Sequence, residues 1–142
     1  MISIVHSIYK DLILEKLVFD FGVVYLLEDI ILSELYRGEV LDTDKALIAL
    51  EEVLNFYEVN HVIKKRLWIA NKTEIYSTKL IGWIQLRAVA LEYFTGFCVV
   101  DDTPSGLVNA LLESKFVPVN FKNVKSLDEA FDWNKELNNN GA

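Results

Sequence analysis

The sequence predicts a single α/β domain in which an N-terminal antiparallel β hairpin is followed by alternating helices and strands in one mixed sheet. The chain has 142 residues and is 52% hydrophobic, which suits one domain with its own core. β-branched and aromatic runs dominate up to about residue 37. After residue 42 the apolar spacing becomes that of helices, interrupted by short apolar runs typical of buried strands.

The β portion is predicted at residues 12–37. Two β-branched and aromatic runs, 23–27 and 30–36, are separated by a short polar break at residues 28–29, which is typical of a hairpin. Gly22 interrupts the apolar residues before the hairpin and indicates a turn or a bulge. Short right-handed crossovers then place the later strands in the same sheet.

The helical pattern begins at Asp42 or Thr43, either of which can accept a first-turn amide hydrogen and cap a helix. The apolar side chains after them recur on one helix face, at Leu47, Leu50, Leu54 and Tyr57. Polar side chains take the opposite face. We therefore expect an amphipathic helix packed on the core.

Three strand-then-helix units are predicted next. Their strands are expected at residues 67–70, 97–100 and 117–121, and their helices at residues 78–91, 104–115 and from residue 126. Pro104 suits a first helical position, and Ser126 begins a Ser-x-x-Glu capping box. Pro118 cannot donate to a strand ladder, so the last strand belongs at the sheet edge. Residues 1–142 are thus one domain, with residues 1–12 as an N-terminal arm and residues 138–142 as a frayed tail.

The composition narrows the classes of function. Fourteen Lys and Arg stand against 21 Asp and Glu, so the net charge is −7 and nucleic-acid binding is not expected. No stretch reaches the roughly 18 uncharged apolar residues of a membrane span, and the start has no basic signal-peptide region. We expect a cytoplasmic protein. The single Cys98 excludes an intrachain disulfide and a multi-cysteine zinc site.

This order of elements resembles the SpoIIAA-like family of small bacterial domains, also called the STAS or STAS/SEC14 group. The resemblance spans residues 22–133 and is carried by residues 23–36, 66–71, 106–113 and 126–130. It implies the family fold and a regulatory role. Antagonist-type members carry a phosphorylated serine in an Asp-Ser-Ser-Gly turn. This chain has Glu-Ile-Tyr-Ser-Thr-Lys at residues 74–79, without that glycine or the Asp-Ser pair.

Polar residues follow the predicted parallel strands, where open α/β sheets usually bind ligands. The candidate ligand site on this rim consists of Asn71, Asp101, Asp102 and Thr103. The paired aspartates suggest a magnesium site or a phosphoacceptor, but magnesium prefers a fuller set of oxygen ligands. Capping of the following helix is the favoured interpretation, and no metal is predicted.

Ser77 and Thr78 stand where a helix is predicted to begin. Either hydroxyl can cap that helix, and either is a candidate phosphorylation switch, because a helix start tolerates the added negative charge. Capping needs no partner enzyme and is the simpler interpretation.

The chain lacks the residue combinations of known catalytic sites. Cys98 lies in an apolar strand and behaves as a buried hydrophobic residue. His6 and His61 are expected on the surface. No nucleophile elbow and no glycine-rich phosphate loop is present. We therefore expect no enzyme and no cofactor.

The segment 80–91 is apolar on nearly every side. Leu80, Ile84, Ala88 and Leu91 share one side of a helix, and Trp83, Leu86, Val89 and Ala90 share another. One side is expected to pack on the sheet. The second needs the N-terminal arm, a second subunit or an apolar ligand, which makes Leu80, Trp83, Ile84, Leu86 and Ala90 the candidate interface or ligand residues.

These observations favour a non-enzymatic regulatory or scaffold module that acts through protein contacts, as a homodimer or with another protein partner. Two alternatives stay open. One is a binder or sensor of an apolar, lipid-like small molecule. The other is a phosphorylation-switched protein similar to the anti-sigma-factor antagonists.

Overall fold

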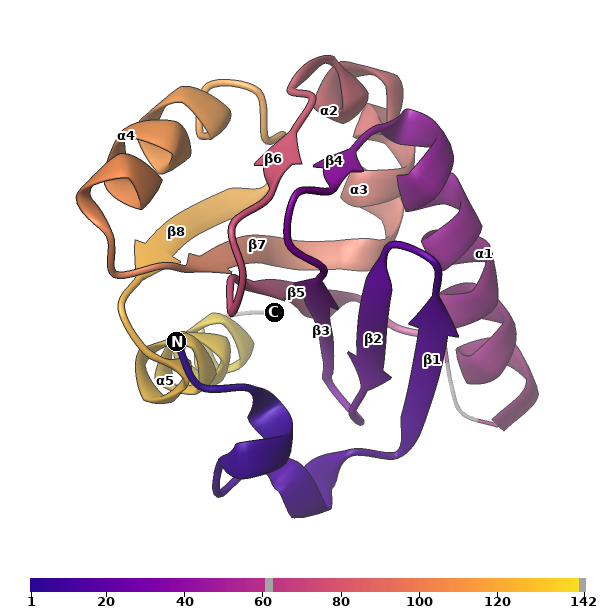
Figure 1. Cartoon of the computed structure of the whole chain (residues 1–142). Coiled ribbons are helices and arrows are strands. Elements are labelled where there is room, and N and C mark those ends of the chain that lie inside the picture. The colour runs from indigo at the N-terminus through magenta and orange to yellow at the C-terminus, as the bar shows by residue number, and fades with distance from the viewer. Residues whose placement is uncertain (61–62, 141–142) are drawn as a thin grey trace.

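The computed structural model describes residues 1–60 and 63–140. Its centre is a mixed sheet with strand order β1-β2-β3-β5-β7-β8 (Figure 1). The strands of this sheet are β1 Glu15–Phe19, β2 Gly22–Leu26, β3 Ile30–Leu35, β5 Arg66–Asn71, β7 Phe94–Val100 and β8 Asn120–Val124. The pairs β1–β2 and β2–β3 are antiparallel, and the later pairs are parallel. The predicted mixed sheet is confirmed.

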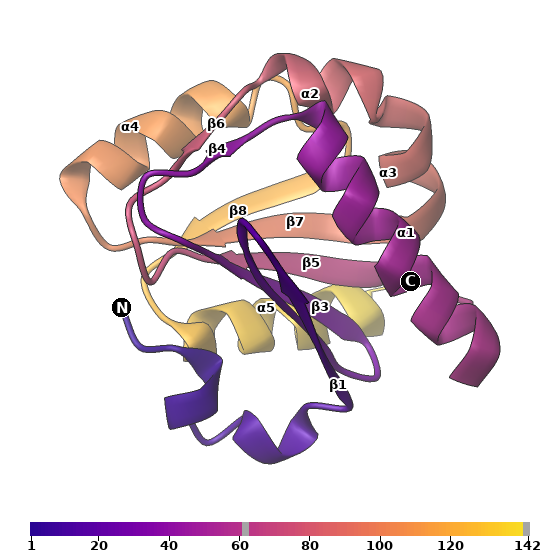
Figure 2. The same ribbon diagram turned by 45° about the vertical axis from the view of Figure 1, so that its right-hand side comes forward.

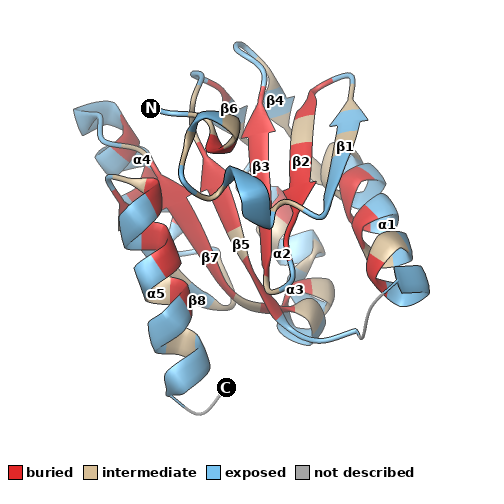
Figure 3. Ribbon diagram, turned by 90° about the horizontal axis from the view of Figure 1, so that it is seen from below, coloured by how far each residue is buried: buried red, intermediate tan, exposed pale blue. Residues whose placement is uncertain are grey.

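The predicted hairpin is formed by β2 and β3, with Val24 opposite Ser33. The turn near Gly22 is also confirmed, because residues 20–21 connect β1 to β2 and Gly22 starts β2. At Gly22 an added Cβ would lie 2.7 Å from the Leu35 Cα, so only glycine allows β2 and β3 to approach this closely. All six residues of β3 are buried, since both faces of the sheet are covered there (Figure 3).

Helices cover both faces of the sheet (Figure 2). The helices are α1 Thr43–Asn60, α2 Ile81–Gln85, α3 Arg87–Tyr93, α4 Pro104–Glu113 and α5 Leu127–Asn139. Helix α5 packs on one face, and α1 to α4 lie on the other. A small two-stranded parallel sheet, β4 Val40–Leu41 with β6 Ser77–Thr78, lies beside the helices of the second face. No helix in the described part of the chain is long and apolar enough to cross a membrane.

The N-terminal arm packs on the α5 face. Ile4 is fully buried in the core cluster that also contains Phe131. The Tyr9 ring stacks on Phe131 with centroids 3.8 Å apart. The arm therefore does not cover the segment 80–91, which lies across the sheet, and that interpretation is wrong. Polar contacts with the sheet set the position of the arm. Local sequence patterns do not predict these contacts.

The predicted helix 78–91 is also wrong in detail. Ser77 and Thr78 lie in β6, because the Ser77 N–H donates to the Glu39 carbonyl and strand β4 pairs beside it. They cap no helix. The remaining helix is divided into α2 and α3 at Leu86, whose backbone leaves the helical region at φ −98° and ψ 9°.

The C-terminal elements shift slightly from their predicted positions. β8 begins at Asn120 rather than residue 117, so Pro118 precedes the strand. The strand lies at the sheet edge, as predicted. α5 starts from Ser126, whose hydroxyl accepts from the Glu129 N–H at 3.2 Å. The helix continues to Asn139, two residues into the tail that is predicted to fray.

Candidate functional site

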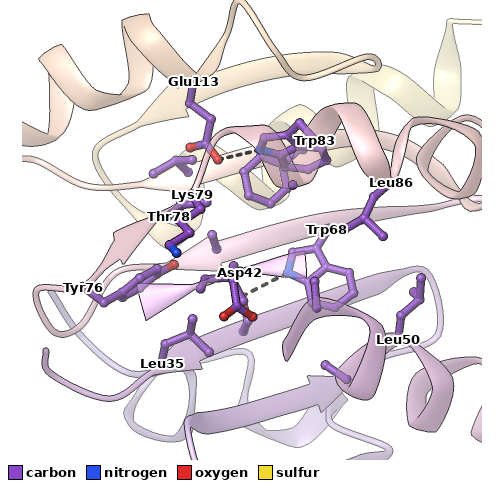
Figure 4. A pocket seen from close by; sticks show the side chains of 18 of the residues that line it. Leu35, Asp42, Leu50, Trp68, Tyr76, Thr78, Lys79, Trp83, Leu86 and Glu113 are labelled. Atoms are coloured by element: carbon purple, nitrogen blue, oxygen red, sulfur yellow. Dashed lines mark hydrogen bonds between the residues drawn. The ribbon is translucent and has the colours of Figure 1, made fainter. Parts of the chain in front are cut away.

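A cavity of about 90 Å³ lies between the sheet and helices α1 to α3 (Figure 4). It is partly open to solvent and mainly apolar. Its floor includes Trp68, Ala70 and Phe97 on the strands. Leu50 of α1, Trp83 of α2 and Leu86 between α2 and α3 also line it. The β6 segment and the end of α4 close its side. The cavity is the space left between the core side chains of the sheet and those of the helices.

Strand alternation explains which side chains reach the cavity. On β5, Leu67 and Ile69 belong to the core on the α5 face, while Trp68 and Ala70 point to the opposite face. Trp68 fills much of this face, whereas Ala70 beside it is small. A large side chain next to a small one leaves space that the helices above do not fill.

Both tryptophans of the cavity donate hydrogen bonds to neighbouring side chains. Trp68 Nε1 donates to Ser33 Oγ at 3.0 Å. Trp83 Nε1 donates to Glu113 Oε2 at 2.8 Å and joins α2 to the end of α4. The Trp83 ring also packs edge-to-face on Phe97, with centroids 4.7 Å apart. These bonds fix the orientation of both indole rings, because a buried indole N–H needs an acceptor.

Glu113 is a buried carboxylate at the edge of the cavity. It is only 6% exposed. Burial raises its pKa above the usual range, although the hydrogen bond from Trp83 and the positive charge of Lys72 oppose that shift. Among the residues with described positions, its carboxylate forms no salt bridge.

Tyr76 lies on the opposite side of the same space, within the segment that leads to β6. Its ring is buried, and Lys72 Nζ lies 4.6 Å from the ring centroid. Burial raises the pKa of the Tyr76 phenol, and the nearby charges of Glu113 and Asp101 act in the same direction. The phenol therefore stays neutral and can donate a hydrogen bond.

The architecture matches one solved structure over most of its length. An uncharacterized protein of the DUF3478 family from Shewanella loihica PV-4, described as having a SpoIIAA-like fold, superposes with a TM-score of 0.51. The match covers 80% of this chain and 91% of that chain. The fold is SpoIIAA-like. At 14% sequence identity the match shows the fold alone. No protein-family model and no curated protein matches the sequence.

Within this SpoIIAA-like fold, the predicted interface residues separate into two groups. Trp83 and Leu86 line the cavity. Ala90 is the buried residue of α3, and Leu80 is half-buried. Ile84, in contrast, is 56% exposed. One side of segment 80–91 therefore faces inward and the other faces outward, and in this single chain the outward side is exposed.

The predicted phosphorylation positions also separate. Thr78 lines the cavity, whereas Ser77 is exposed and its side chain lies outside the lining. Adjacent residues of a strand point to opposite sides, which accounts for the difference. Phosphorylation of either hydroxyl stays a prediction.

The predicted rim residues do not form one open ligand site. Asn71 is fully buried, and its Nδ2 donates to the Glu34 carboxylate and to the Ile2 carbonyl. Asp101 Oδ1 accepts from the Thr103 N–H at 2.9 Å, and the Thr103 hydroxyl caps α4. Asp102 is exposed. The described residues contain no group of three acidic, cysteine or histidine side chains that could hold a metal.

Sequence reasoning missed Glu113, Trp68 and Tyr76. A signal for Glu113 is present in the pattern of α4, where Gly106, Ala110 and Glu113 share the buried face at helical spacing. An acid on the same face as two small residues predicts that the carboxylate is enclosed. His61, predicted to lie on the surface, falls outside the described residues.

Proposed function

We propose that the protein is a non-enzymatic module that binds a small apolar molecule in the cavity between the sheet and helices α1 to α3. The observation that carries this proposal is a solvent-connected, mainly apolar space beside two oriented indole rings. Ligand sites are usually apolar concavities with a few fixed polar groups. The Trp68 and Trp83 rings supply flat surfaces on which an aromatic ring can pack.

The size of the cavity limits the ligand. A volume of about 90 Å³ exceeds the roughly 10–15 Å³ that a cavity needs to hold one water and is below the roughly 150 Å³ of an engineered cavity that takes benzene. A single ring or a short chain fits if it extends into the open mouth. A ligand with two long acyl chains does not fit.

The hydrogen bonds of the polar groups that line the cavity favour a binding role over catalysis. Ser33 Oγ accepts from Trp68, and Glu113 accepts from Trp83. Thr78 is the other hydroxyl that reaches the lining from a strand. Each of the two acceptors holds an aromatic ring in place, and an activated nucleophile would need an adjacent base instead.

The test is a calorimetric titration with toluene as a single-ring probe, together with a variant that fills the cavity. Ala70→Met should keep the fold, measured by circular dichroism, and abolish saturable binding. Leu111→Ala, on the exposed face of α4, is the matched control and should bind as the wild type does. The proposal fails if wild-type protein shows no saturable binding, or if Ala70→Met binds equally well. Ala46→Met, which fills the cavity from α1, gives the same test if Ala70→Met does not fold.

A second candidate function is contact with another protein, and the outer face of α4 favours it. This face is apolar and exposed: Leu107 is 54%, Val108 58%, Leu111 61% and Leu112 49% exposed. No charged residue occurs between Pro104 and Leu112. Two copies that each carry a charge of −7 can meet there without opposing like charges, so a homodimer through α4 is the form that we propose.

Molar mass in solution tests this second function. Light scattering after size-exclusion chromatography should give twice the 16.3 kDa chain mass. Leu111→Lys should return the protein to one chain mass, whereas Ile84→Lys, on the exposed side of α2, should leave the dimer unchanged. A wild-type protein that remains a monomer at every concentration contradicts the homodimer.

A further inference from the structure

Glu113 occupies an energetically costly position. Its carboxylate is buried, and it is the last residue of α4, where the helix dipole disfavours a negative charge. Burial of a carboxylate without a cation costs several kcal/mol unless the group becomes protonated. A side chain that is costly in the free protein and aimed at a cavity is a candidate for ligand recognition.

No described neighbour of Glu113 forms a salt bridge with its carboxylate. Trp83 Nε1 supplies one hydrogen bond to Oε2, and the indole carries no charge. Lys72, the lysine whose charge acts on Glu113, has its Nζ over the Tyr76 ring. Asp42 is an acidic residue that also lines the cavity, but its carboxylate accepts from the Lys45 N–H at the start of α1. The raised pKa of Glu113 agrees with a carboxyl group whose burial is incompletely compensated.

We infer that Glu113 is the polar recognition group of the cavity and that the ligand is a small apolar amine bound as its ammonium ion. This inference rests on the proposed small-molecule function. The ammonium group would donate to the Glu113 carboxylate, and the apolar part would lie between the Trp83 and Trp68 rings. Charge-assisted hydrogen bonds are stronger than neutral ones, and nearby aromatic faces also attract cations. Figure 4 shows Glu113, Tyr76 and Trp83 around the same space.

Three probes of the same ring size test the inference: toluene, benzylamine and benzoate, titrated calorimetrically into the full chain at pH 7. Benzylamine should bind at least about tenfold more tightly than toluene, and benzoate should bind more weakly than toluene. Lys72 and Lys79 also line the cavity, so a preference for benzoate is the opposite outcome and overturns the inference. The order of the three affinities in wild-type protein needs no variant.

Glu113→Gln separates recognition from structure, because glutamine can still accept from Trp83 but carries no charge. The variant should reduce benzylamine affinity by at least about tenfold more than it reduces toluene affinity. Equal loss for both probes would mean that Glu113 only positions Trp83, and the inference would fail. If toluene binds but benzylamine gains nothing, the inference is wrong while the proposed function stands. If no probe binds, the proposed function itself fails.

Discussion

Asn71 and Glu34 meet in the interior of the sheet, where Asn71 Nδ2 on β5 donates to Glu34 Oε2 on β3 at 2.9 Å. The same carboxylate accepts from Ser3 Oγ at 2.6 Å and from the Ile4 N–H at 2.8 Å. A buried acid thereby receives three donors, two of them from the N-terminal arm. The arm is held on the sheet by this carboxylate together with the burial of Ile4.

Glu34→Ala should detach the arm. The substitution removes the acceptor of three hydrogen bonds, including the one that the buried Asn71 amide donates. We therefore expect a loss of about 3 kcal/mol in the free energy of unfolding. Urea unfolding measures the loss, and hydrogen exchange should show weaker protection at Ile4. Glu58→Ala, at an exposed position of α1, is the control and should change neither measurement. Unaltered exchange at Ile4 in Glu34→Ala would contradict this account of the arm.

Gly106→Ala should disturb the start of α4. An ideal Cβ at this position lies 2.1 Å from the Asp101 Cγ, so the Asp101 carboxylate must move away. That movement breaks its bonds to the Thr103 N–H and hydroxyl, at a cost of about 1–2 kcal/mol.

The double variant Gly106→Ala, Asp101→Ala checks this mechanism. Both single changes remove the same hydrogen bonds. In thermal or urea unfolding, the loss of stability in the double variant should therefore be smaller than the sum of the losses in the two single variants. Strictly additive losses would show that the two residues are not coupled. Ser105→Ala, also near the start of α4 but exposed, serves as a comparison.

Stability should fall in alkaline solution. Burial raises the pKa of Tyr57 to about 12, and burial with the Asp128 hydrogen bond raises the pKa of Tyr9 to about 12, against an ordinary value of 10.0. The unfolded chain therefore loses these protons first. The free energy of unfolding should be unaffected by them below pH 10 and should decrease between pH 10 and 12. Tyr57→Phe should flatten this decrease in urea unfolding, whereas Tyr36→Phe, at an exposed position, should not.

The Cys98 thiol should be unreactive in the folded protein. Burial in β7 leaves it 0% exposed and raises its pKa to about 12, so the nucleophilic thiolate is rare near neutral pH. Labelling with a chromogenic disulfide reagent at pH 8 should be slow in buffer and rapid in denaturing urea. Rapid labelling of the native protein would mean that β7 opens readily.

Elements that depend only on neighbouring residues could be predicted from the sequence. The polar break between two β-branched runs specified the β2–β3 hairpin, and the Ser126 capping box specified the start of α5. In both cases the physical cause acts within a few residues, as an alternation or a cap.

Contacts between segments that are distant in the sequence could not be predicted in this way. Ser77 and Thr78 became a strand because β4 lies beside them, and the arm packed on α5 because Glu34 and Asn71 receive it. The cavity arises where Trp68 and Ala70 face helices that come from other parts of the chain. The contact of Trp83 with Glu113 spans 30 positions of sequence. Periodicity describes one element at a time, whereas a cavity and its buried charge exist only in the packing between elements.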